Sequence, residues 1–188
     1  MTPNSSRTPA RRRGGRSLLA CALLFAGCAE NPPELLLLIT VDTLRADRVG
    51  AFGSRYDLTP NIDALAAESV VFETAYAAAP FTLPSVSGLM TGRHPEALGI
   101  HRNESLVPDD VPTLASELSS RGWRTQAVVS NVILRHESGI ASGFDVFDDE
   151  FPQAEAVRRW PERTAADTTD AALGSLRECR DSAAPCCL

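Results

Sequence analysis

The sequence predicts an α/β fold with a largely parallel sheet, and three observations carry this prediction. A continuous apolar run at residues 35–41 has the length of a strand and is typical of parallel strands covered on both faces. Helical patterns alternate with further strand-like segments along the chain. With 188 residues, 44% of them hydrophobic, the chain is long enough for one domain with its own core.

The first half of the chain contains two predicted helices and a second strand. We expect a helix at residues 59–69, because Thr59 can cap it and Pro60 suits its first turn. Residues 70–76 are strand-like. The next helix begins at Thr82, has Pro84 in its first turn and ends at Gly92.

The second half continues the alternation. Residues 113–121 are predicted to form a helix that Thr113 caps and Gly122 terminates. Residues 125–130 follow as a buried strand, and residues 143–149 as a short edge strand or a loop. Residues 162–177 have a helical pattern, and the expected inner face contains Ala165, Ala166, Leu173 and Leu176.

The two ends of the chain differ from this pattern. Residues 1–27 combine a basic start with a short apolar run and are predicted to be an export signal. Leu24-Phe-Ala-Gly-Cys28 resembles a bacterial lipobox, so we expect Cys28 to carry lipid and residues 28–34 to be a tether. The protein is then a bacterial membrane-anchored lipoprotein facing the periplasm or exterior; simple secretion is the alternative. Residues 178–188 are interpreted as an aberrant tail, with a frameshifted or truncated frame preferred to a genuine Cys-rich terminus.

Composition excludes several function classes. The chain contains no lysine, which excludes a P-loop lysine and a Schiff-base lysine. Its net charge is −6, and we expect no nucleic-acid partner. The body of the chain has no cysteine, so no disulfide framework and no thiolate metal site is expected there.

Two residues point to chemistry. Asp42 ends the first predicted strand, and Thr82 opens the helix of small residues. In α/β proteins such positions meet at the carboxyl edge of the sheet, where ligands bind. A carboxylate that holds a metal beside a hydroxyl is a minimal set for attack on a phosphate or sulfate ester. A simple helix cap at Thr82 is the alternative.

Several segments together resemble the amino-terminal half of a sulfatase, within the alkaline phosphatase superfamily. The resemblance covers residues 35–177, treated as a partial sulfatase N-terminal domain, and rests on residues 39–47, 59–65, 82–95, 122–127 and 143–145. It implies an alkaline phosphatase-like three-layer sandwich that is incomplete at the C-terminus. It also implies that Asp42 is a metal ligand and that Thr82 holds the nucleophile position and shares the metal. The implied metal is a divalent ion such as calcium, zinc or manganese.

The sequence departs from the sulfatase pattern at specific positions. Thr82 stands where sulfatases have a Cys or Ser that becomes formylglycine, and threonine cannot undergo that conversion. Val86, Ser130 and Val132 replace an arginine, a lysine and a histidine of the family, and Thr43 replaces a second aspartate. Related superfamily members use an unmodified threonine to attack phosphorus, and Thr82 fits that scheme better.

Further site candidates and alternatives complete the prediction. Arg93 and His101 are candidate substrate-binding residues, although an ion pair at the helix end and a solvated loop histidine are the alternatives. The predicted function is metal-dependent hydrolysis of sulfate or phosphate esters. Because the family's carboxy-terminal metal ligands are absent from this sequence, we expect the chain as written to be inactive. A non-catalytic binder of anionic glycans and a non-functional gene fragment are the competing hypotheses.

Overall fold

The computed structural model describes residues 35–151 and 161–188, and four parallel strands form its sheet. The strands are β1 (Leu35–Leu36), β2 (Arg124–Val128), β3 (Val146–Asp148) and β4 (Cys186–Cys187). Their spatial order is β1-β4-β2-β3, so the last strand in sequence lies between the first and the second. In register, Cys186 pairs with Leu35 on one side and with Arg124 on the other. The predicted α/β class with a parallel sheet is confirmed.

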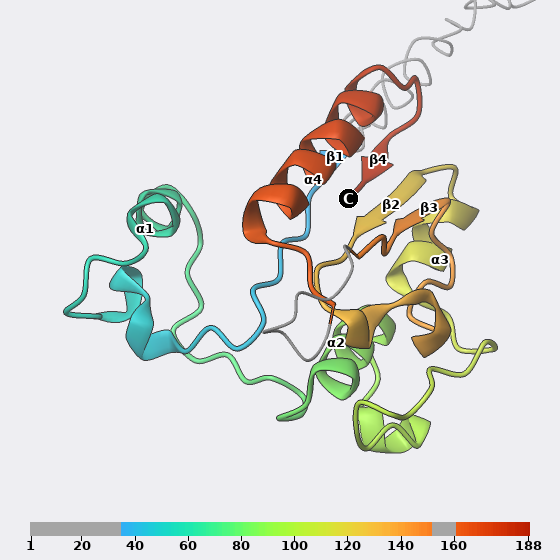
Figure 1. Ribbon diagram of the computed structural model, residues 1–188, viewed down its shortest axis with the longest axis horizontal. Coiled ribbons are helices and arrows are strands. Elements are labelled where there is room, and N and C mark those ends of the chain that lie inside the picture. The colour runs from blue at the N-terminus through green and yellow to red at the C-terminus, as the bar shows by residue number, and fades with distance from the viewer. Residues whose placement is uncertain (1–34, 152–160) are drawn as a thin grey trace, which may run out of the picture. The chain divides into compact units, whose positions relative to one another are not determined.

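Helices lie beside the sheet as the sandwich prediction requires. Helix α4 (Ala165–Arg180) and helix α3 (Leu114–Ser120) both contact β2 and lie on its two sides (Figure 1). The Gln126 side chain of β2 is buried and faces α4, where it contacts Glu178. Helix α2 (Thr82–Thr91) packs near α3.

The first predicted strand is much shorter than the apolar run that predicted it. Only Leu35–Leu36 is assigned to β1, and backbone hydrogen bonds with Leu188 extend the pairing to Leu38. Every residue from 35 to 41 is exposed, which contradicts the prediction of a strand buried on both faces. The reason is that no described helix covers β1 as α3 and α4 cover β2, so an apolar sequence alone does not bury it.

A second strand prediction is wrong. Residues 70–76 form no strand, and Val70, Phe72 and Tyr76 are exposed. Their β-branched and aromatic side chains favour a strand, but β-propensity depends on a neighbouring strand and a surface to pack on. Neither is present here among the described residues.

The helix predictions of the first half are confirmed, with differences at their starts. Helix α1 (Pro60–Ala67) follows Thr59, but the Thr59 hydroxyl bonds the Asp63 carboxylate instead of a backbone N–H of the first turn. Helix α2 runs from Thr82 to Thr91, and Gly92 ends it at a φ of 64°. This left-handed conformation favours glycine at a helix end.

Helix α3 begins as predicted. Thr113 accepts a hydrogen bond from Ser116 N at 3.1 Å, and Ser116 Oγ accepts one from Thr113 N at 2.8 Å. This reciprocal capping satisfies two backbone N–H groups that the first turn leaves without partners.

The tail contributes to the fold. Helix α4 continues three residues past the predicted end, and its buried positions include Cys179, whereas Ala165, Ala166 and Leu173 of the expected inner face are exposed. Cys179 forms a disulfide with Cys186, and Cys187 is a buried free thiol. Residues 178–188 therefore complete α4 and supply a strand to the sheet; the frameshift interpretation stays a prediction.

Short 3-10 turns complete the described elements. They are η1 (Ala46–Arg48), η2 (Gly50–Phe52), η3 (Pro95–Leu98), η4 (Val132–Leu134) and η5 (His136–Ser138). The core is a cluster of six buried residues that come from α2, α3 and the loops between α2 and β3: Leu83, Met90, Ile100, Val107, Ala115 and Ile140. Residues at the start of α2 are thus fixed by the core beneath them.

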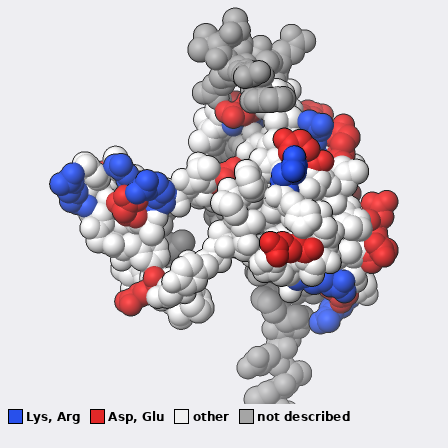
Figure 2. All heavy atoms as spheres, turned by 90° about the horizontal axis from the view of Figure 1, so that it is seen from below, with Lys and Arg blue, Asp and Glu red and all other residues white. Residues whose placement is uncertain are grey.

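The surface and the termini add two observations. Figure 2 shows Arg and acidic side chains interspersed on one face of the molecule. In the described part of the chain, no helix combines the length and apolarity needed to cross a membrane. The predicted signal (1–27), the tether (28–34) and the lipidation site Cys28 lie outside the described residues.

Candidate active site

The structure brings together the two residues that the sequence singled out. The Thr82 hydroxyl donates a hydrogen bond to Asp42 Oδ2 at 3.1 Å, although forty residues separate the two positions. Thr82 is the first residue of α2 and is half-buried, while Asp42 follows the β1 segment and is exposed. A hydroxyl held against a carboxylate is the arrangement of a nucleophile beside a proton acceptor.

Residue 43, directly after Asp42, has an unusual backbone. Thr43 has a φ of 56°, which is the one positive φ outside glycine among the described residues. A β-branched residue rarely adopts this left-handed conformation, which costs about 1–2 kcal/mol. Thr43 is exposed, and its conformation turns the chain immediately after the carboxylate that faces Thr82.

A third residue joins this pair, and sequence analysis missed it. Asn131 Nδ2 donates a hydrogen bond to the same Asp42 Oδ2 at 2.8 Å. Asn131 lies three residues after the end of β2. The signal that could have found it is the rule that led to Asp42, because polar side chains beyond the carboxyl ends of parallel strands share one edge of the sheet.

The start of helix α2 offers few free backbone N–H groups to an anion. Leu83 N donates to Asn103 Oδ1 at 3.1 Å, and Pro84 has no N–H. In the first turn this leaves the Thr82 N–H as the donor without a partner in the described chain. Asn103, which the sequence analysis did not single out, therefore caps α2, because the residue before the helix, Phe81, has no side-chain acceptor.

A cavity of about 280 Å³ adjoins this helix start. Its walls include Phe81 and Pro84, which flank Thr82 in sequence, together with the polar side chains of His94, Glu96 and His101. The predicted substrate-binding residue His101 therefore lines a hollow together with Phe81 and Pro84, which flank Thr82 in sequence.

Arg93 is placed differently. It follows the C-terminal end of α2 and is exposed, and its carbonyl lies beside Gly88. None of the hydrogen bonds or ion pairs within the described ranges joins its side chain to Thr82 or Asp42. The structure does not bring Arg93 to the other site residues, and its predicted role stays untested.

The donor set of the described residues is small for a metal ion. Within residues 35–151 and 161–188, no three His, Cys, Asp or Glu side chains come together as a metal-binding group. Asp42 and Thr82 supply oxygen, whereas calcium takes six to eight oxygen ligands and zinc takes four ligands. The described residues do not fit a complete metal site.

Comparison with known proteins establishes the family. The family model for sulfatases matches residues 34–177, which is most of the chain. The chain belongs to the sulfatase family. Among relatives of this sulfatase chain, the Delta 4,5-hexuronate-2-O-sulfatase of Bacteroides thetaiotaomicron is 32% identical over 138 residues, which cover 68% of this chain and 28% of that protein. Arylsulfatase A of Bos taurus is 34% identical over 108 residues, covering 54% and 21%.

Solved structures support the sulfatase fold. The phosphonate monoester hydrolase of Agrobacterium radiobacter aligns with a TM-score of 0.63 and 22% identity, covering 82% of this chain and 40% of that one. A 2-O GAG sulfatase aligns with a TM-score of 0.57 and 23% identity, covering 83% and 34%. The sulfatase chain thus spans 21% to 28% of the length of these curated relatives, and less than half of these solved structures.

Proposed function

We propose that this chain carries the nucleophile-bearing part of a hydrolase of sulfate or phosphate esters. The observation that supports it most is the hydrogen bond between Thr82 Oγ1 and Asp42 Oδ2, because it places an unmodified hydroxyl beside a carboxylate in a member of the sulfatase family. The named activities of the relatives, hydrolysis of sulfate and phosphonate esters, are consistent with it.

The proposed reaction uses Thr82 as it stands. Thr82 Oγ1 attacks the sulfur or phosphorus of the ester, and its proton passes to Asp42 Oδ2. The bond to the alcohol oxygen breaks, this oxygen keeps the electron pair and takes a proton from solvent, and Asp42 returns its proton to solvent. Water then attacks the covalent intermediate, which releases sulfate or phosphate and regenerates the hydroxyl. The cavity lined by Phe81 and His101 is the proposed site for the alcohol part of the ester.

The family resemblance implies a cation, and in this proposal Asp42 and Thr82 would be two of its ligands. A bound divalent ion supplies charge stabilisation to phosphoryl and sulfuryl transfer. Since the described residues supply only two oxygen donors, no step above depends on it.

Hydrolysis assays test the proposed nucleophile. The purified chain is assayed with p-nitrophenyl phosphate and p-nitrophenyl sulfate, with and without added Ca²⁺, Zn²⁺ or Mn²⁺. We expect Thr82→Ala to reduce the rate to background, while the matched variant Thr82→Ser, which keeps a hydroxyl, retains measurable turnover. Equal rates for the original protein and Thr82→Ala would remove Thr82 from the mechanism. The ratio of the hydrolysis rates of the two substrates decides whether phosphate or sulfate esters are preferred.

A second function is favoured by the replaced positions. Val86, Ser130 and Val132 lack the arginine, lysine and histidine of the family pattern, and the loss of these groups supports a chain that binds anionic glycans but does not cleave them. Saturable binding of a sulfated oligosaccharide by a chain without turnover, unchanged in Thr82→Ala, supports the binder. If the protein shows neither turnover nor binding, the remaining hypothesis is a non-functional gene fragment.

We further propose that the protein is exported and anchored by lipid at Cys28. The basic residues and short apolar run before Cys28 support this proposal. Labelling with a radioactive fatty acid is expected to mark the original protein and to leave Cys28→Ala unmarked. Unlabelled protein recovered from the medium would contradict the anchor and favour simple secretion.

A further inference from the structure

We infer that the side-chain amide of Asn131 takes the position beside Asp42 that a cation would otherwise hold, and that it positions the Asp42–Thr82 pair. Asn131 is then a positioning residue that works through Asp42. The inference deepens the proposed function and rests on it for the role of the pair, but the contacts that carry it are independent of any activity.

The first step is the sharing of one carboxylate oxygen. Asp42 Oδ2 accepts hydrogen bonds from Asn131 Nδ2 at 2.8 Å and from Thr82 Oγ1 at 3.1 Å. A hydrogen bond to a charged acceptor is stronger than one between neutral groups. The amide therefore fixes the oxygen that faces the nucleophile, and Thr82 is placed by the same contact.

The second step is the orientation of the amide, which its other end determines. Asn131 Oδ1 accepts a hydrogen bond from Ile133 N at 3.0 Å and caps the turn η4. Turning the amide over would set its oxygen against the Asp42 carboxylate and its NH₂ group against the Ile133 N–H. Both contacts would become repulsive, so Asn131 presents hydrogen atoms to the site and is not an oxygen ligand for a metal.

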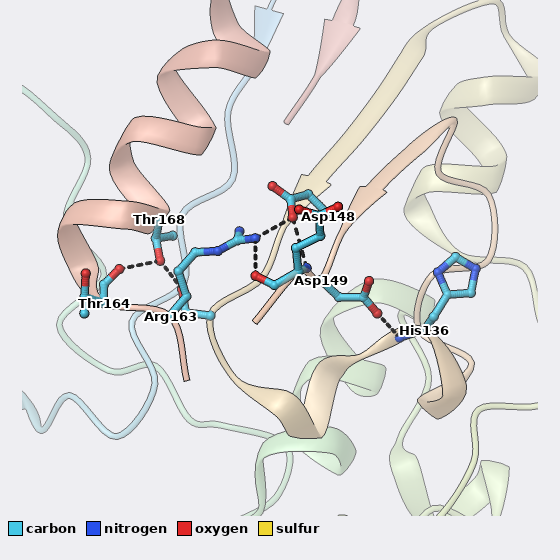
Figure 3. A network of polar contacts seen from close by, with 8 residues as sticks. His136, Asp148, Asp149, Arg163, Thr164 and Thr168 are labelled. Carbon is cyan, nitrogen blue, oxygen red and sulfur yellow. Dashed lines mark hydrogen bonds and ion pairs between the residues drawn. The ribbon is translucent and has the colours of Figure 1, made fainter. Parts of the chain in front are cut away.

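The third step is the frame that holds Asn131. Arg163 N donates to Ser130 O at 3.1 Å, Asn131 forms a bridge with Glu162, and Ser130 Oγ lies 2.6 Å from Thr168 Oγ1. Figure 3 shows the Arg163 side chain reaching Asp148, and Arg163 Nη2 also donates a hydrogen bond to the carbonyl oxygen of Glu150 at 2.7 Å. Only 7% of the Arg163 side chain is exposed. The segment before α4 and the end of β3 thus fix the backbone at Ser130 and Asn131.

The consequence is that the pair can form without an ion. In a site built for a cation, the metal would draw Asp42 and the hydroxyl together. In this chain a neutral donor does so, from a frame that is already rigid. The amide also lies against the oxygen where a cation would bind, so a cation must displace it or use Asp42 Oδ1.

Metal binding tests this inference without any need for turnover. Titration calorimetry measures the affinity of the full chain for Ca²⁺ and Mn²⁺, and the same titrations are made with Asn131→Asp. This substitution replaces a donor by a second carboxylate, which gives three oxygen-bearing side chains. We expect it to bind both ions at least about tenfold more tightly than the original protein.

Two further variants keep the test decisive. Asn103→Asp adds the same charge beside α2 without touching Asp42, and we expect no gain in affinity. Asn131→Ala removes the amide without adding charge, and is expected to bind the ions at least as tightly as the original protein. Circular dichroism checks that each variant is folded.

Two results would overturn the inference. One is an original protein that binds Ca²⁺ or Mn²⁺ as tightly as Asn131→Asp. The other is weaker binding by Asn131→Ala, which would make the amide oxygen a ligand. These affinities are measured without substrate, so they can be determined even if the protein hydrolyses no ester. The proposed function and the role of Asn131 can therefore be disproved independently of each other.

Discussion

Residues 35–81 are richer in hydrophobic residues than residues 82–148, yet they are far less buried. All six residues of the core cluster come from the second segment. In the first, Val49 is the one buried hydrophobic residue, while Ile39, Val70 and Tyr76 are 72%, 83% and 89% exposed. The difference is that α2 and α3 pack on shared neighbours, whereas the described residues give β1 and α1 no comparable cover. An apolar segment is buried only where another helix or strand covers it, and an apolar sequence alone is not sufficient.

This difference also divides the candidate site, which takes one residue from the first segment and two from the second. Thr82 stands on the packed helix α2 and Asn131 follows the buried strand β2, while Asp42 comes from the exposed segment. The hydrogen bonds at Asp42 Oδ2 therefore join a well-packed part of the molecule to a poorly packed one. Exposed apolar surface of this extent is typical of an interaction surface or of a liability to aggregate.

The largest expected effect comes from shortening one leucine in each segment. Leu83 on α2 is 0% exposed and Leu65 on α1 is 67% exposed. Leu83→Ala should lower the free energy of unfolding by about 3 kcal/mol, because it removes buried methyl groups and leaves a cavity. Leu65→Ala should change it by less than about 0.5 kcal/mol. Urea denaturation of both variants measures the difference, and equal losses would mean that α1 is as well packed as α2.

A smaller effect is expected from two glycines of equal backbone conformation. Gly143 and Gly53 have φ angles of 87° and 85°. A Cβ on Gly143 would lie 2.2 Å from Ser116 N, whereas one on Gly53 meets nothing within 4 Å. Gly143→Ala should therefore cost about 2–3 kcal/mol from strain and overpacking together, and Gly53→Ala about 1 kcal/mol from strain.

Thermal unfolding with a calorimeter compares the two glycine variants. Because both glycines have nearly the same φ, the strain energy of an alanine is nearly the same at both positions. The remaining difference in the loss of stability therefore measures the clash of the Gly143→Ala side chain with α3. A Gly53→Ala variant that loses as much stability as Gly143→Ala would show that residues 35–81 are packed by contacts the structure does not contain.

Local features of the fold were predictable from sequence, and features that depend on distant partners were not. Gly92 and the Thr113 cap end and start their helices through contacts within a few residues, so their sequence signals sufficed. The run at 35–41 and the segment at 70–76 needed strands and helices from elsewhere in the chain to become buried. The apolar side chains of these two segments favour packing, but the strands and helices that would cover them must come from other parts of the chain.

The site divides in the same way. The juxtaposition of Asp42 and Thr82 was predictable, because the carboxyl edge of a parallel sheet and the start of a helix are defined by short patterns. Asn131 was not singled out: its position after β2 indicates the same edge of the sheet, but it does not show that the side chain would bind Asp42. The disulfide between Cys179 and Cys186 was also missed, because α4 was expected to end before Cys179 and β4 was not expected at all.

The buried thiol of Cys187 makes the sheet observable in solution. Cys187 lies in β4, whose neighbours are β1 on one side and β2 on the other, and burial raises the pKa of its thiol. In a variant whose Cys21 and Cys28 are replaced by alanine, a thiol-specific chromophore therefore reacts with Cys187 only when this strand leaves its place, and the reaction rate measures how often it does so. With the other two nearby cysteines joined to each other, the chain carries its own reporter on whether its exposed and packed halves come apart.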